Sequence, residues 1–414
     1  MNLSNRFYYG WVIVIGAFLC YMGWGVSRYL YPYVLPTIEA ELNLTHEPMG
    51  IIASTYFFAY TIMTFVWGII ADRIGPRKCM LMGLVIILIG LSCMGFMSSP
   101  ITGSLSYLLC GAGAAGIAVP VVPLISNWFG RQRRGIAFGL ATAGTGVAPA
   151  VLGIVVPLIL FNYSWRWSWW FGAAFVLVMA ITSWFLLVDT PAKRGLSPAG
   201  ASNGEPSVSP KELGAKSYEQ TQFKVPIRDI LKRGTVWNLA GIYFIWGIGE
   251  MVFVTFAVAY LEEIGWGVRA AAGAYATFGA LIMPAPIIWG VAADRITKKY
   301  LFIMALALQA IGMLIFLGGS TVGGYVGAGI IGFAFIGIPT VMQAAMADYY
   351  EPTIIGTTYG FITLGFAVGA IIAPTVGGIL GDRTGTLSTA ILLGLGALIL
   401  AFMLALMLKK PPKR

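Results

Sequence analysis

The chain has 414 residues, of which 58% are hydrophobic and only 10% are charged, and its mean hydropathy is +0.83. A soluble domain is normally about 25% charged, so this composition excludes an ordinary water-soluble globular protein. The formal net charge of +10 raises the alternative of nucleic-acid binding, which the distribution of the charges argues against below. We therefore expect lipid to surround much of the chain.

Twelve apolar segments are long enough to cross a bilayer, whose core of about 30 Å takes roughly 20 helical residues. The first follows a short segment carrying Arg6 and is too long for the apolar region of a cleaved signal peptide. We therefore predict that it stays as a membrane helix. The expected spans are 11–36, 49–71, 79–97, 102–128, 135–161, 168–188, 236–261, 270–293, 300–318, 322–346, 354–378 and 386–408.

A polar stretch separates the first six spans from the last six. Its segment Ser197–Lys216 is rich in Ser, Pro, Gly and charged residues, which cannot bury enough apolar surface to order themselves. The end of the stretch, residues 225–233, is read as a short amphipathic helix on the membrane surface. We predict an all-α membrane protein with a six-helix bundle at 1–188, a linker at 189–235 and a second six-helix bundle at 236–414.

Basic residues gather on one side of the predicted membrane. That side carries both termini, the linker with its eight Lys and Arg residues, and the basic even-numbered connections, whereas the other side has only Arg166, Arg269 and Arg383. Cytoplasmic connections are enriched in Lys and Arg. We therefore expect both termini in the cytoplasm, a location in a prokaryotic cytoplasmic (inner) membrane, and no nucleic-acid partner.

The two halves share a repeated sequence. Residues 67–74 and 289–296 lie 222 positions apart and are identical at six of eight positions. The same offset aligns Tyr21 with Tyr243 and Trp24 with Trp246, and an offset of 221 aligns glycines of the fifth and eleventh spans. Both copies enter the membrane from the same side, so we expect parallel repeats related by an axis along the membrane normal.

Residues 68–78, Gly-Ile-Ile-Ala-Asp-Arg-Ile-Gly-Pro-Arg-Lys, resemble the loop signature of the major facilitator superfamily. The resemblance implies two six-helix bundles that rock around a central site. Residues 128–146 and 10–18 further resemble the fifth-helix motif and the first-helix opening of monocarboxylate transporters, and oxalate–formate exchangers are similar. The chain departs from these branches because span eight carries no charge and span eleven carries no basic residue.

The repeated loop also predicts a latch between the halves. A glycine there allows two helices to approach closely, and an aspartate can pair with arginines or with helix N-termini across the interface. The alternative is a solvated turn whose charges only set the topology. The residues of this predicted cytoplasmic latch are Gly68, Asp72, Arg73, Arg77, Asp294 and Arg295.

Two charges lie inside the predicted spans. Of the 26 basic residues only Arg28 does so, and of the 16 acidic residues only Glu250. Ionisable groups in a membrane cost several kcal/mol by most estimates and usually face a cavity or a partner. The repeat offset of 222 relates the two residues, so we expect them to face each other across the central cavity from the first helix of each half.

Aromatic residues share the helix faces of these charges. Steps of four and seven positions back from each charge give the predicted substrate-binding neighbours Tyr21, Trp24, Tyr243 and Trp246. The planar guanidinium of Arg28 matches a carboxylate, and desolvation of Glu250 favours its protonated form. The alternative is a static strut or outer gate, because the helical rise of about 1.5 Å per residue puts both past the midplane.

The function that these features favour is secondary active transport of a small organic anion, a monocarboxylate, by symport with protons. A drug or metabolite exporter of the same superfamily, working as a proton antiporter, is the alternative. A channel would need a continuous polar lining. An enzyme would need clustered His, Cys or acids, whereas His46 stands alone and the four cysteines lack metal-ligand spacing. We thus expect a monomer in the lipid bilayer with no catalytic site, cofactor or metal.

Overall fold

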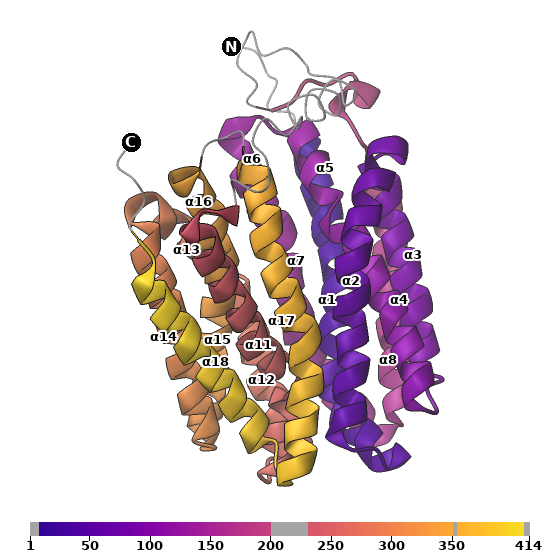
Figure 1. The fold of residues 1–414 in the computed structure, drawn as a ribbon. Helices are drawn as coiled ribbons and strands as arrows, with labels where there is room; N and C mark the ends of the chain where they lie inside the picture. Colours follow the sequence, from indigo (N-terminus) through magenta and orange to yellow (C-terminus); the bar gives the residue numbers. More distant parts are fainter. Residues whose placement is uncertain (1–7, 200–230, 351–353, 410–414) are drawn as a thin grey trace.

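The computed structural model describes residues 8–199, 231–350 and 354–409. Most of these residues are helical (Figure 1). The helices of the first half are α1 (Gly10–Leu42), α2 (His46–Ile74), α3 (Pro76–Met94), α4 (Pro100–Ala118), α5 (Val121–Trp128), α6 (Arg131–Thr142), α7 (Gly144–Asn162) and α8 (Trp165–Leu186), followed by a 3₁₀ turn at Pro191–Arg194.

The second half is built in the same way. Its helices are α11 (Gly234–Glu263), α12 (Val268–Ile282), α13 (Ala285–Arg295), α14 (Lys298–Leu317), α15 (Thr321–Phe335), α16 (Gly337–Tyr349), α17 (Ile355–Thr384) and α18 (Ser388–Met407). Most of the predicted linker, residues 200–230, lies outside the described residues, and with it fall most of Ser197–Lys216 and of the predicted helix at 225–233.

The number of spans agrees with the prediction. Within the described residues, eleven helices are long and apolar enough to cross a membrane, and α12 with α13, bent by 41° at their junction, can form a twelfth span. The bend follows from Pro284, since a proline inside a helix lacks the amide hydrogen and clashes with the preceding turn. The expected all-α fold with up to twelve spans is confirmed.

The sequence repeat is also a repeat of contacts. Trp67 Nε1 donates to the carbonyl oxygen of Ala112 at 2.8 Å, and Trp289 Nε1 donates to that of Phe333 at 2.8 Å. These partners are related by the offsets of 222 and 221 residues found in the sequence. Each bond ties the second span of its half to the fourth, so the shared geometry extends beyond the matching octapeptides.

A stripe of glycines shows how the two halves meet. Gly139, Gly146 and Gly153 are spaced by seven residues along α6 and α7, so they share one face. A Cβ atom on Gly153 would lie 2.5 Å from Ala276 Cβ, and one on Gly146 would lie 3.0 Å from the carbonyl oxygen of Gly279. Both contacts are with α12, and only glycine allows so close an approach.

The third glycine of the stripe has no neighbour. A Cβ atom on Gly139 would meet nothing within 4 Å. The end of the bundle where α1 begins and α18 ends, called the terminal end here, is also the end at which α6 lies (Figure 1). Gly139 belongs to α6, and Gly153 is ten residues into α7, farther from this end. Along this face the halves are therefore packed closely toward the opposite end, whereas Gly139, nearer the terminal end, has no close neighbour.

Candidate functional site

Arg28 lies where α1 of the first half passes α11 of the second. Its Nη2 donates to Met251 Sδ of α11 at 3.6 Å. The guanidinium carbon is 5.3 Å from the ring centroid of Tyr29, 5.5 Å from that of Phe57 and 5.7 Å from that of Phe335. Cation–π attraction operates within about 6 Å, so aromatic rings from both halves surround this cation.

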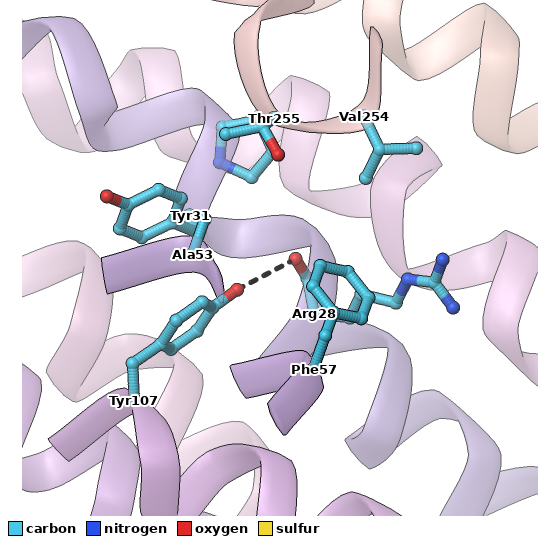
Figure 2. Close-up of a pocket in the computed structure, with 8 residues that line it drawn as sticks. Arg28, Tyr31, Ala53, Phe57, Tyr107, Val254 and Thr255 are labelled. Carbon is cyan, nitrogen blue, oxygen red and sulfur yellow. Dashed lines mark hydrogen bonds between the residues drawn. The ribbon is translucent and has the colours of Figure 1, made fainter. Parts of the chain in front are cut away.

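A small cavity adjoins Arg28 (Figure 2). Its volume is about 10 Å³, and its lining comes from both halves: Arg28, Tyr31, Pro32, Ala53, Phe57, Tyr107, Val254 and Thr255. The hydroxyl group of Tyr107 donates to the main-chain oxygen of Arg28 at 3.2 Å, whereas the guanidinium points away from Tyr31 and Tyr107. Such a volume holds about one water molecule, so a substrate would enter only if the helices move apart.

Glu250 is completely buried in the second half, with 0% of its surface exposed. Its Oε2 accepts a hydrogen bond from Gln309 Nε2 of α14, and Gln309 Oε1 accepts one from Trp246 Nε1 at 3.0 Å. Glu250 Oε1 has no hydrogen-bond partner. An unpartnered carboxylate oxygen away from water is costly, which marks this position as one that needs a further partner.

The two charges approach each other without pairing. No ion pair within 4.0 Å joins Arg28 to Glu250 in the described part of the chain, although the two lie close enough for their charges to attract. Arg28 Nε also lacks a hydrogen-bond partner. The expectation that the pair faces each other across a cavity stays a prediction: Arg28 reaches toward α11, where it contacts Met251. Glu250 instead contacts Gln309 within its own half.

The predicted aromatic neighbours pack against other side chains of their own half, and the rings nearest Arg28 are Tyr29, Phe57 and Phe335. Trp24 Nε1 donates to the Tyr56 hydroxyl at 3.0 Å and its ring stacks on Tyr60 at 5.9 Å, with Tyr21 at 5.0 Å. In the second half, the rings of Tyr243 and Phe366 lie 5.4 Å and 4.9 Å from that of Trp246. The Tyr243 hydroxyl is buried without a partner.

The predicted latch residues do not bridge the halves in this conformation. Arg77 donates from its main-chain nitrogen to Asp189 Oδ1 at 3.0 Å and from its guanidinium to the Trp184 carbonyl oxygen at 2.7 Å, both within the first half. A Cβ atom on Gly68 would lie 4.0 Å from Val119 Cγ1, so no helix approaches it closely.

The other latch side chains give the same picture. Asp72, Arg73 and Arg295 are exposed and form no hydrogen bond or ion pair to the other half among the described residues. The side chain of Asp294 is not among those described. The latch stays a prediction for a conformation in which the terminal end closes.

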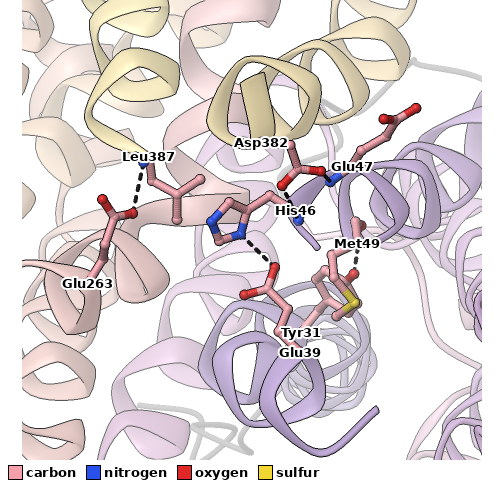
Figure 3. Close-up of polar contacts among 8 residues, drawn as sticks. All are labelled: Tyr31, Glu39, His46, Glu47, Met49, Glu263, Asp382 and Leu387. Atoms are coloured by element: carbon pink, nitrogen blue, oxygen red, sulfur yellow. Dashed lines mark hydrogen bonds and ion pairs between the residues drawn. The ribbon is translucent and has the colours of Figure 1, made fainter. Parts of the chain in front are cut away.

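A polar network that the sequence analysis missed joins the halves at the opposite end (Figure 3). Asp382, near the end of α17, accepts hydrogen bonds from the main-chain nitrogens of His46 and Glu47, each at 2.8 Å. The ring of His46 bonds Glu39 at 2.8 Å. Asp382 thereby caps the N-terminus of α2, which belongs to the other half, and helix N-termini favour negative charge.

Comparison with known families agrees with this architecture. A model of the Major Facilitator Superfamily matches residues 13–288, and a second, described as "Uncharacterised MFS-type transporter YbfB", matches residues 215–406. The chain belongs to the major facilitator superfamily. The superfamily resemblance noted in the sequence is thus confirmed, whereas the monocarboxylate and oxalate–formate branch is not shown.

Curated relatives cover nearly the whole chain. A hexuronate transporter of Bacillus subtilis is 25% identical over 94% of this chain and 92% of its own. A probable sulfoacetate transporter of Cupriavidus necator is 25% identical over 91% of this chain and 90% of its own. A probable hexose phosphate transport protein of Chlamydia pneumoniae is 25% identical over 61% of this chain and 57% of its own.

Solved structures share the fold. A point mutant of the nucleoside transporter NupG superposes with a TM-score of 0.75 at 14% identity, covering 97% of this chain and 100% of its own. A bacterial homologue of the human lysosomal transporter Spinster, in an inward-facing and occupied conformation, gives a TM-score of 0.72 at 17% identity, covering 98% of this chain and 97% of its own.

Proposed function

We propose that this protein is a secondary active transporter that moves a small organic anion, a carboxylate, across the cytoplasmic membrane by alternating access. The observation that carries the proposal is Arg28: a cation at the contact between the halves, ringed by aromatic side chains, with its Nε unpartnered. A half-buried guanidinium without a carboxylate partner is suited to binding an anion, because its planar fork matches carboxylate geometry.

The named relatives support an anionic cargo. Hexuronate and sulfoacetate are both small organic anions that carry a carboxylate, and the transporters named for them match more than nine-tenths of this chain. Within this class, a monocarboxylate is the simplest cargo for one arginine.

The orientation follows from the positive-inside rule, which assigns the terminal end to the cytoplasm. On that assignment the glycine stripe of α6 and α7 packs closely against α12 toward the outer side, and it has free space beside Gly139 toward the cytoplasmic side. Transport requires the contact toward the outer end to open while the cytoplasmic end closes.

We further propose proton coupling through Glu250. With the substrate absent, the attraction of Arg28 favours the ionised carboxylate; a bound anion would neutralise that attraction and add a negative charge nearby. The other ionisable groups close to Glu250 are the hydroxyls of Tyr29 and Tyr275. Anion and proton would then bind together, which is the thermodynamic basis of symport.

The test is uptake into proteoliposomes of labelled carboxylates, including short monocarboxylates, a hexuronate and sulfoacetate, with and without an inward proton gradient. The proposal expects at least one acid to accumulate only with the gradient and to be lost in Arg28→Ala. Transport of neutral or cationic compounds alone, with no carboxylate competing, would contradict it.

A further inference from the structure

Three side chains in series hold Glu250 in one orientation. Trp246 Nε1 donates to Gln309 Oε1 at 3.0 Å, and Gln309 Nε2 donates to Glu250 Oε2. An indole nitrogen can only donate, so the oxygen of the Gln309 amide faces Trp246 and its NH₂ group faces Glu250. Gln309 is 0% exposed and lies on α14, from which its side chain reaches Glu250 on α11.

These two hydrogen bonds leave one oxygen of the Glu250 carboxylate without a partner. Glu250 Oε1 is buried without a partner, and so are Arg28 Nε and the Tyr243 hydroxyl. Tyr243 lies seven residues before Glu250 on α11, on the same helix face. Arg28 and Glu250 lie close enough for their charges to attract, and leaving a buried polar atom unsatisfied is costly, so a polar ligand between these two side chains would satisfy both open atoms.

The unpartnered atoms of Arg28 and Glu250 have complementary hydrogen-bonding roles. Arg28 Nε donates, Glu250 Oε1 accepts, and no ion pair within 4.0 Å joins them among the described residues. An unsubstituted carboxylate would satisfy Arg28 and leave Glu250 Oε1 unpartnered. A carboxylate that also carries a hydroxyl group can satisfy both, and a hydroxyl serves either protonation state of Glu250 because it both donates and accepts.

We infer that Gln309 is a positioning residue that presents Glu250 Oε1 to a hydroxyl group of the transported anion, so that the site prefers hydroxy-carboxylates over unsubstituted carboxylates. This inference rests on the proposed function and narrows its substrate class. Gln309 acts through Glu250 and need not touch the substrate itself.

The experiment measures competition with counterflow of a labelled carboxylate in proteoliposomes. The three-carbon competitors are propanoate, 2-hydroxypropanoate and 2-methoxypropanoate, the last of which keeps an acceptor oxygen but has no donor; hexanoate and a hexuronate form the six-carbon pair. The proposed coupling leaves Glu250 protonated while the anion is bound, so one hydrogen bond between neutral groups predicts a roughly fivefold preference of the wild type for the hydroxy acids.

The variants separate positioning from structure. Gln309→Met keeps the length and removes both hydrogen bonds, so it should bring the hydroxy preference close to one while propanoate and hexanoate compete as before. Gln343→Met is the matched control, because Gln343 is exposed and its amide bonds only the Tyr359 hydroxyl at 3.4 Å. Trp246→Phe, which removes the donor that orients Gln309, is the second variant if Gln309→Met does not fold.

Each outcome is decisive. A hydroxy preference that disappears in Gln309→Met or Trp246→Phe and persists in Gln343→Met supports the inference. Equal loss of all competitors, an unchanged preference in both variants, or no preference in the wild type overturns it while the carboxylate carrier stands. If no carboxylate competes even in the wild type, the proposed function itself has failed.

Discussion

The carboxylate of Asp382 accepts the main-chain N–H groups of both His46 and Glu47 at 2.8 Å, so a residue of the second half caps a helix of the first. The capped end of α2 is also held by close backbone contact, since a Cβ atom on Gly378 would lie 2.3 Å from the carbonyl oxygen of His46. This pairing exists only while the opposite end is closed.

Asp382→Ala should therefore favour opening of the opposite end. Loss of a helix cap costs about 1 kcal/mol, which corresponds to a roughly fivefold change in a two-state population. The measurement is the rate at which an impermeant maleimide labels Ser54→Cys from outside in a background without the four native cysteines. Ser54 is buried at this interface, where its hydroxyl bonds Thr375 at 2.8 Å.

Glu263→Ala is the matched control for that experiment. Glu263 Oε2 accepts the main-chain N–H of Leu387 at 2.8 Å and so caps α18, but both residues belong to the second half. Its removal should leave the labelling rate of Ser54→Cys unchanged. Equal acceleration by both variants would mean that loss of any cap loosens the protein, and the gating role of Asp382 would be wrong.

Gly153→Val should also prevent closure of the opposite end, because its side chain would collide with Ala276, whose Cβ lies 2.5 Å from the site of the added carbon. Gly139→Val is the comparison, since nothing lies within 4 Å there. Gly153→Val should speed labelling of Ser54→Cys, whereas Gly139→Val should leave this closed end intact and hinder closure of the terminal end. The same labelling pattern in both variants would contradict the assignment of the two ends.

Arg28→Lys should impair transport at least tenfold although it keeps the charge. An ammonium group cannot form the two parallel hydrogen bonds that a guanidinium offers to a carboxylate. Arg166→Lys is the control, because Arg166 pairs with Glu41 at the protein surface. The check is the affinity and rate of carboxylate counterflow. Wild-type affinity and rate in Arg28→Lys would mean that only the positive charge at this position matters, and not the shape of the guanidinium.

Glu250→Gln should abolish proton-driven accumulation and retain exchange. The amide resembles the protonated acid and cannot release a proton, so an inward proton gradient should no longer drive uptake while counterflow of labelled substrate continues. The two activities are measured in the same proteoliposomes. Continued uphill uptake with only a pH gradient would refute the coupling, and parallel loss of both activities would assign Glu250 a structural role.

The sequence predicted the helices and the repeat because both depend on local pattern. Long apolar segments specify spans directly, and the octapeptides that contain Trp67 and Trp289 proved to make equivalent hydrogen bonds. Charged residues inside spans led to Arg28 and Glu250 because desolvation makes them rare. The latch around Asp72 stays a prediction, because among the described residues its exposed side chain bonds nothing in the other half.

Two important residues escaped this reasoning. Gln309 is uncharged, and only its position on α14 against Glu250 reveals its partner. Asp382 lies beyond the predicted end of span eleven. Its role depends on contact with His46 of α2, which lies 336 residues earlier in the chain. A single sequence with weak internal symmetry gives no direct measure of such contacts between halves.

The spacing of Gly139, Gly146 and Gly153 would allow one face of α6 and α7 to tilt as a unit around Gly146. Fourteen residues of helix measure about 21 Å, so a tilt of about 20° around Gly146 would displace each end by about 4 Å. That displacement is enough to separate Gly153 from Ala276 and to bring Gly139 toward the facing helix. Contact at the terminal end and contact at the opposite end would then be made by the two ends of the same rigid helix face. Opening both ends at once would require this face to bend.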